Sequence, residues 1–176
     1  AFKNSKSSKA GATSLQIESG DLALDTKTLM QALADLGATG KADEVIKVPG
    51  TSTRLIVFTG LGKASASYDH EVLRRAAGAA ARALAGNSSA TFSLPAKSIS
   101  GIRGVAEGAA LGSYLFDQFR GSTKSVQKTP LKSITIHTDL ASQATAKSAA
   151  KSAEVIATYT NLVRDLINTP PSHLTP

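Results

Sequence analysis

Hydrophobic positions along this chain follow two spacings, one typical of strands and the other typical of helices. Short apolar or alternating runs predict strands at residues 15–17, 45–48, 54–59, 91–94 and 131–137. Apolar residues three or four positions apart predict helices at residues 26–36, 68–85, 101–119 and 144–167. Because strands and helices alternate, the sequence predicts an α/β fold in which helices cover both faces of a sheet.

The strand at residues 54–59 is an unbroken apolar run, which is typical of a strand buried on both faces of a parallel sheet. Gly60-Leu61-Gly62-Lys63 follows it and predicts a turn before the next helix. A glycine turn in this place can direct backbone N–H groups at a phosphate. The spacing of a dinucleotide fingerprint or P-loop is lacking, so we favour a structural turn.

A second group of glycines lies in the helix predicted at residues 101–119. Gly101 is followed by Gly104, Gly108 and Gly112, and the last three are four positions apart. They can be interpreted as a binding loop, but this spacing places small residues along one helix face. We therefore expect close packing of this helix against another helix or against the sheet.

The last predicted helix, at residues 144–167, changes character along its length. Its first half is polar and alanine-rich, whereas its second half carries Val155, Tyr159, Leu162 and Leu166. Such a helix is suited to connecting two bodies. Asn168-Thr169-Pro170-Pro171 then stops it, because proline lacks an N–H and moves the preceding residue out of the helical region. We expect the chain to continue into another folded unit.

Charge and composition narrow the possible partners. The 176 residues contain 20 Lys and Arg against 13 Asp and Glu, a net charge of +7. A basic surplus raises the possibility of nucleic acid or an anionic membrane as a partner. Here the surplus is spread between a Ser-rich start and a Ser/Thr-rich loop: Lys3, Lys6, Lys9, Arg120, Lys124, Lys128 and Lys132. We interpret it as a solubility feature, with nucleic-acid binding as a minor alternative.

The absence of cysteine excludes disulfides, cysteine-bound zinc and thiol catalysis. No secretory signal and no apolar run long enough to span a bilayer is recognised in the sequence. The prediction is a cytoplasmic protein without a membrane partner.

A search for catalytic chemistry finds no site. His70, His137 and His173 are far apart, and none has a second histidine or cysteine at helical ligand spacing. Ser172 lies too close in sequence to His173 to suggest a catalytic dyad. The sequence therefore predicts no catalytic, cofactor-binding or metal-binding residue in this segment.

Three segments nevertheless resemble the leucyl aminopeptidase family. They are residues 55–63 (LIVFTGLGK) with the following RRAAGAAARAL, residues 101–120 (GIRGVAEGAALGSYLFDQFR) and residues 163–176 (VRDLINTPPSHLTP). Their order is similar to that in the family's amino-terminal half. The Ser- and Lys-rich composition of the start predicts a flexible tail at residues 1–13. The resemblance implies a macro-domain-like α/β domain with a mixed sheet at 14–143, a linker helix at 144–168 and the start of the catalytic domain at 169–176.

In this family the carboxy-terminal domain holds two divalent metal ions, manganese or zinc, and hydrolyses peptides from their amino terminus. None of its ligand motifs is present in this sequence, so no metal or catalytic residue is transferred to it. The resemblance implies a non-catalytic segment that contacts its own catalytic domain, supports a homo-hexamer and affects access of peptide substrates. Two alternatives stay open, namely a macro-like module that binds ADP-ribose or a nucleotide through the glycines at 60–63 and 101–104, and a DNA-binding accessory domain.

Overall fold

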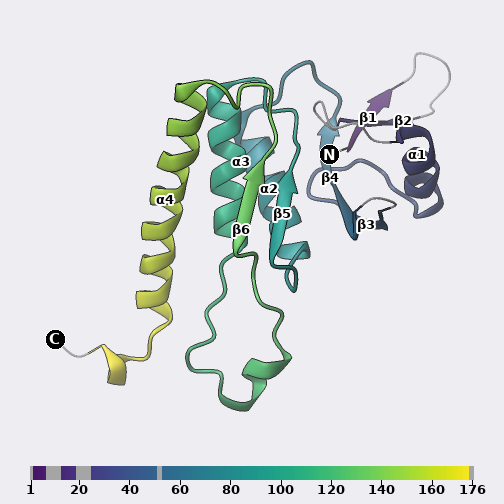
Figure 1. Cartoon of the computed structure of the whole chain (residues 1–176). Helices are drawn as coiled ribbons and strands as arrows, with labels where there is room; N and C mark the ends of the chain where they lie inside the picture. Colours follow the sequence, from purple (N-terminus) through teal and green to yellow (C-terminus); the bar gives the residue numbers. More distant parts are fainter. Residues whose placement is uncertain (1, 7–12, 19–24, 51–52, 175–176) are drawn as a thin grey trace.

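A computed structural model describes residues 2–6, 13–18, 25–50 and 53–174 of the chain (Figure 1). Its strands are β1 (Phe2–Lys6), β2 (Thr13–Ile17), β3 (Val45–Pro49), β4 (Leu55–Lys63), β5 (Ser89–Phe92) and β6 (Ser133–Ile136). Its α-helices are α1 (Thr26–Asp35), α2 (His70–Ala83), α3 (Ile99–Gly112) and α4 (Ala144–Asn168). Two short 3-10 helices are η1 (Gly121–Val126) and η2 (Pro171–His173).

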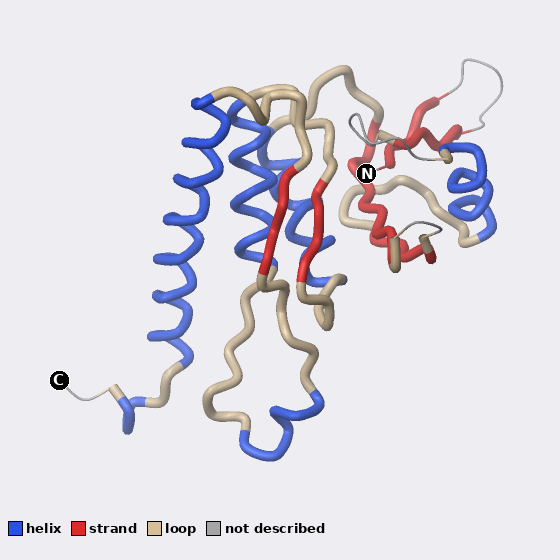
Figure 2. Tube along the Cα trace, in the orientation of Figure 1, coloured by secondary structure: helices blue, strands red, loops and turns tan. Residues whose placement is uncertain are grey.

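The described strands divide between two sheets, as Figure 2 shows. One has the order β2-β1-β4-β3, in which β4 is parallel to β1 and antiparallel to β3. The other is the parallel pair β5-β6. The predicted α/β class is confirmed, but one continuous sheet does not form. The two neighbours of β4 in the first sheet are β1 and β3, so β5 pairs with β6 instead.

The first strand corrects the prediction of a flexible tail at residues 1–13. Phe2–Lys6 forms β1, which pairs with β2 on one edge and β4 on the other. Strand pairing uses backbone N–H and C=O groups, so a polar run of Ser, Asn and Lys can form a strand when partners flank it on both sides. Residues 1 and 7–12 lie outside the described part of the chain.

Strand β4 is covered on both faces, as its apolar run predicts. Phe58 joins α1 residues Leu29 and Leu33 in one buried cluster. Val57 and Leu61 belong to a second cluster with residues of α2. Successive side chains of a strand point to opposite faces, so one strand supplies both clusters.

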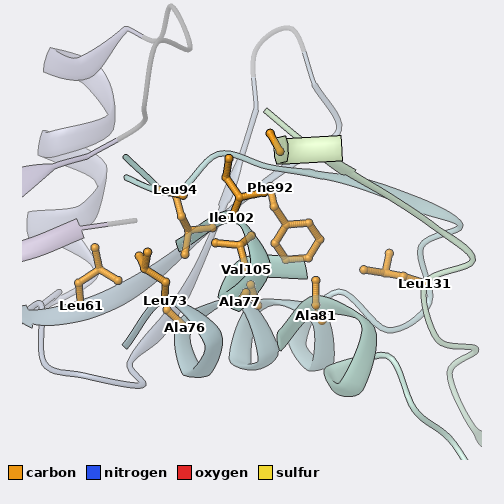
Figure 3. Close-up of a cluster of buried hydrophobic side chains, with 14 residues drawn as sticks. Leu61, Leu73, Ala76, Ala77, Ala81, Phe92, Leu94, Ile102, Val105 and Leu131 are labelled. Carbon is orange, nitrogen blue, oxygen red and sulfur yellow. The ribbon is translucent and has the colours of Figure 1, made fainter. Parts of the chain in front are cut away.

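The larger core lies between α2, α3 and the β5-β6 pair (Figure 3). Leu73 on α2, Ile102 and Val105 on α3 and Phe92 on β5 are at most 3% exposed. Much of the remaining α2 surface is alanine, which permits the two helices to approach closely. Ser98 caps α3, since its hydroxyl accepts a hydrogen bond from the N–H of Gly101 at 3.1 Å.

The predicted packing role of the α3 glycines is confirmed. A Cβ atom built on Gly104, Gly108 or Gly112 would overlap the backbone of α2. The distances to the nearest carbonyl oxygens would be 2.5 Å to His70, 2.0 Å to Arg74 and 2.5 Å to Gly78, respectively. Only glycine allows the backbones of α2 and α3 to meet along this face.

The end of α3 differs from the prediction of a helix through residue 119. The helix ends at Gly112, and Ser113 caps it. The apolar spacing continues into Phe116 and Phe119, but these rings pack against each other, with centroids 5.8 Å apart. Tyr114 bonds to Asp165 and Phe119 contacts His173, so contacts with the end of the chain outweigh the helical periodicity.

We predict that Gly108→Ala destabilises the domain strongly. The new methyl group overlaps the Arg74 carbonyl, so the helices must separate, at a cost of about 3 kcal/mol. At this chain length that corresponds to a fall in Tm of roughly 6–12 °C in thermal unfolding.

Gly101→Ala is the matched control in the same helix. A Cβ atom on Gly101 would not overlap a carbonyl oxygen of α2: its nearest neighbours are the Leu73 side chain at 3.2 Å and the Ser98 hydroxyl at 3.3 Å. Gly101→Ala and Gly108→Ala both replace a helical glycine by alanine, so both gain about 1 kcal/mol in helix propensity. Equal Tm values for the two variants would contradict the role of the backbone contact.

Candidate functional site

The glycines at residues 60–63 do not form the predicted turn. They continue β4, and the N–H groups of Gly60 and Gly62 donate to the carbonyls of Glu44 and Gly40 at 2.8 and 3.0 Å. Gly62 has φ of +78°, and a Cβ on Gly60 would lie 1.8 Å from the Lys41 carbonyl oxygen. The turn prediction is wrong because these glycines admit a crossing backbone segment, and both N–H groups are already bonded to it.

The second glycine candidate, residues 101–104, lies inside α3. Ser98 occupies the N–H of Gly101, and Gly104 faces the backbone of α2. Neither position forms an open loop around a phosphate group. The ADP-ribose alternative therefore has no support from the two glycine segments on which it depends.

The three histidines occupy separate places. His70 begins α2 and lies 3.0 Å from the carboxylate of its neighbour Asp69, in an exposed pair. His137 follows β6 and donates its backbone N–H to Phe92. His173 is in η2, where its Nδ1 is 3.0 Å from the Ser172 hydroxyl. Among the described residues, no three His, Asp or Glu side chains converge as a metal site would require.

A cavity of about 890 Å³ opens between the two sheets, lined by α1, β3, β4, β5 and the end of α2. Asp25 is the one carboxylate among its described lining residues, and it is already used as the N-cap of α1, accepting from the N–H of Thr28. Hydrogen bonds from the side chain and the backbone of Thr28 lower the pKa of Asp25. A divalent cation needs several oxygen or nitrogen ligands, so this cavity does not provide a metal centre.

The most unusual surface of the described chain is on α4. Its buried residues are all small, namely Ala146, Ala153 and Ala157. Its large apolar residues point away from the domain and are between 38% and 77% exposed: Val155, Ile156, Tyr159, Leu162, Val163, Leu166 and Ile167. We call these seven residues the α4 apolar face. A helix normally buries its large apolar side chains, so this face is suited to contact with another protein surface.

Directed contacts hold the final turns of α4 to the end of α3. The Tyr114 hydroxyl donates to Asp165 at 2.9 Å and accepts from Asn168 at 3.2 Å. The Arg164 guanidinium lies 5.1 Å from the centroid of the Tyr114 ring and donates to the Leu111 carbonyl at 3.2 Å. We call Tyr114, Arg164, Asp165 and Asn168 the Tyr114 cluster.

Beyond α4, an aromatic contact fixes η2. The His173 ring meets the Phe119 ring edge-on, with centroids 4.8 Å apart. Helix α4 ends at Asn168, as the Thr-Pro-Pro sequence predicts. Figure 1 shows α4 running along α3 on the side of the molecule away from the four-stranded sheet. Thr175 and Pro176, the last residues of the predicted junction, lie outside the described part.

The sequence of the folded core identifies its family. Residues 2–123 match the model of the cytosol aminopeptidase family, N-terminal domain. This chain belongs to the cytosol aminopeptidase family. The family resemblance predicted from three segments is thereby confirmed, and the match includes β1, which lies in the region predicted as a tail.

Curated relatives of this cytosol aminopeptidase domain are named "Probable cytosol aminopeptidase". The Streptomyces griseus protein is 38% identical over 176 aligned residues, covering 90% of this chain and 34% of the relative. The Corynebacterium diphtheriae protein is 40% identical over 147 residues, covering 82% of this chain and 28% of the relative. The chain thus spans about a third of the length of the curated relatives it matches.

Solved structures share the fold. The bottromycin maturation enzyme BotP, solved in complex with Mn, matches with a TM-score of 0.67 and 26% identity over 89% of this chain and 32% of that chain. A mutant of tomato leucine aminopeptidase matches with a TM-score of 0.63 and 26% identity, over 84% of this chain and 30% of that chain.

The sequence pattern alone does not indicate the Tyr114 cluster. A signal was present, since Arg164, Asp165 and Asn168 interrupt an otherwise apolar stretch at spacings of one and three. Their partner Tyr114 lies within the helix that the apolar spacing predicts through residue 119. No helix-terminal or turn motif connects residues so far apart in sequence.

We predict that the Tyr114 phenol titrates at a higher pH than a free tyrosine. Burial is the largest cause that raises its pKa, and the hydrogen bond to Asp165 also raises it, while Asn168 and Arg164 act in the opposite direction. Because the folded pKa lies above the unfolded one, its contribution to stability is present below about pH 10 and is lost as the pH rises through the folded value. An ultraviolet titration of phenolate formation measures this.

The Tyr114→Phe variant identifies the responsible residue. It should lack the titration component that lies above the pKa of a free tyrosine. If the variant and the parent protein give superimposable titration curves, the assignment to Tyr114 is wrong.

Proposed function

We propose that this chain is the non-catalytic amino-terminal domain of a metal-dependent aminopeptidase and that it acts by contact with the catalytic part of the same polypeptide. Two observations support the proposal. The chain matches the N-terminal domain of the family and spans about a third of its relatives. The α4 apolar face is exposed on the helix that follows the matched region.

The α4 apolar face is the observation that carries this proposal. Its seven residues are spread over the second half of a helix that is about 37 Å long. Leaving so many large side chains in water loses stabilisation of roughly 25 cal/mol for each Å² that could be buried. The proposed occupant is the catalytic part of the aminopeptidase, since the chain matches the family's N-terminal domain and covers only about a third of its relatives.

The chemistry of the proposed enzyme is hydrolysis of the amino-terminal residue of a peptide. Two divalent ions, manganese or zinc, would activate water and hold the peptide when bound in the catalytic domain. The described residues of this chain do not fit such a centre, because their carboxylates and histidines do not converge. In this proposal the segment itself contributes no catalytic step.

The domain's role is architectural in this proposal. It supports assembly of a homo-hexamer in the cytoplasm and limits access of peptides to the catalytic domain. No helix among the described residues is both long and apolar enough to cross a bilayer. The scattered positive charge serves solubility, since several cations on the described surface are paired, including Arg103 with Glu107 and Lys124 with Asp117.

We predict that the 176-residue chain does not hydrolyse leucine p-nitroanilide with added Mn²⁺ or Zn²⁺, while the full-length protein does. Purification with parallel activity assays provides the measurement. Hydrolysis that follows the 176-residue chain through every column would disprove a non-catalytic role.

A second prediction tests the α4 apolar face directly. Leu162→Lys should change the stability of the 176-residue chain by less than about 0.5 kcal/mol, because Leu162 is exposed there. In the full-length protein the same lysine becomes buried without a partner, which costs about 3 kcal/mol or more. Denaturant unfolding of both lengths measures the difference.

Thr158→Lys is the matched control, since Thr158 is exposed on α4 but outside the apolar face. It should have a small effect in both lengths. If Leu162→Lys is equally harmless in the full-length protein, then the face does not contact the catalytic part.

A further inference from the structure

The Tyr114 cluster holds α4 where burial does not. The three buried alanines of α4 end at Ala157, and residues 158–168 contain no buried residue. Over these turns the helix cannot be oriented by a packed core. The contacts that remain are directional, and they come from the short stretch of chain just after α3.

The cluster joins two helix ends. Arg164 donates to the carbonyl of Leu111, in the last turn of α3, where carbonyl groups have no partner within their own helix. A cation at a helix C-terminus is also favoured by the helix dipole. Asn161 accepts a further hydrogen bond from Arg164 at 3.2 Å, which helps to hold the guanidinium in place.

Tyr114 connects this cap to the final turn of α4. Its ring lies beneath the Arg164 guanidinium, and its hydroxyl bonds to both Asp165 and Asn168. Three residues of α4 thus contact one phenol, one at the face of its ring and two at its hydroxyl. Such an arrangement restricts both rotation of α4 about its axis and bending of its end away from α3.

We infer that the Tyr114 cluster is a positioning device that sets the direction in which α4 leaves the domain. Tyr114 is its central residue, and the Phe119–His173 contact extends the same hold to η2. The inference rests on the proposed function, because the direction of α4 matters for the enzyme only where a catalytic part follows. It assigns to Tyr114 a role in placing that part relative to the amino-terminal domain.

A spin-label distance measurement tests the inference in the 176-residue chain. The sequence contains no cysteine, so Arg82→Cys on α2 and Ile167→Cys near the end of α4 introduce two unique, exposed labelling sites. We expect a narrow distance distribution in this parent protein. Tyr114→Phe removes both hydroxyl contacts but retains the ring, so the distribution should broaden, and Tyr114→Ala should broaden it further.

Two controls separate positioning from general stability. Tyr159→Phe removes the hydroxyl of an exposed tyrosine on the same helix and should leave the distribution narrow. Tyr114→Phe should still unfold in one cooperative transition, with a Tm only a few degrees below that of the parent, because α2, α3 and the sheets pack without this hydroxyl. A loss of helix direction without a loss of folding is specific to a positioning role.

Two results would overturn the inference. One is a distribution as narrow in both Tyr114 variants as in the parent, and the other is equal broadening in Tyr159→Phe. The measurement uses no substrate, so an absence of aminopeptidase activity in the full-length protein would disprove the proposed function and leave the distance result valid.

Discussion

The direct contact between the backbones of α2 and α3 determines most of this structure. Glycines four residues apart on α3 place the two helix axes close enough that a single methyl group would overlap a carbonyl oxygen. This close approach brings Leu73, Ile102 and Val105 into one core and gives β5 and β6 a surface on which to pack. Helix α4 then packs on α3, so its position also depends on that contact.

The sequence predicts the elements well where one period dominates. Residues 144–167 and the proline stop give α4 almost completely, and the α3 glycines give a helix contact. It fails where tertiary partners decide. Backbone pairing on both edges makes a strand of residues 2–6, a crossing segment extends β4 through Gly60 and Gly62, and contacts with α4 end α3 at Gly112.

The candidate site was predictable in part for the same reason. Val155, Tyr159, Leu162 and Leu166 mark one side of a helix in the sequence, which predicts a link between two bodies. The pattern does not show which side of α4 faces the domain. The residues that pack against the domain are alanines, and alanine is common at any position of a helix. The partners of Tyr114 on α4 could not be predicted from the pattern, since they lie fifty or more residues away in sequence.

The central place of β1 has a consequence for synthesis on the ribosome. Its partner β4 is made more than fifty residues later, so the first strand must remain unpaired on that side while α1 and β3 emerge. Pairing over such a distance is slow compared with local structure. The Lys, Asn and Ser residues of Phe2–Lys6 are suited to this interval, because a nascent edge rich in charge and polarity resists association with other chains until its partner arrives.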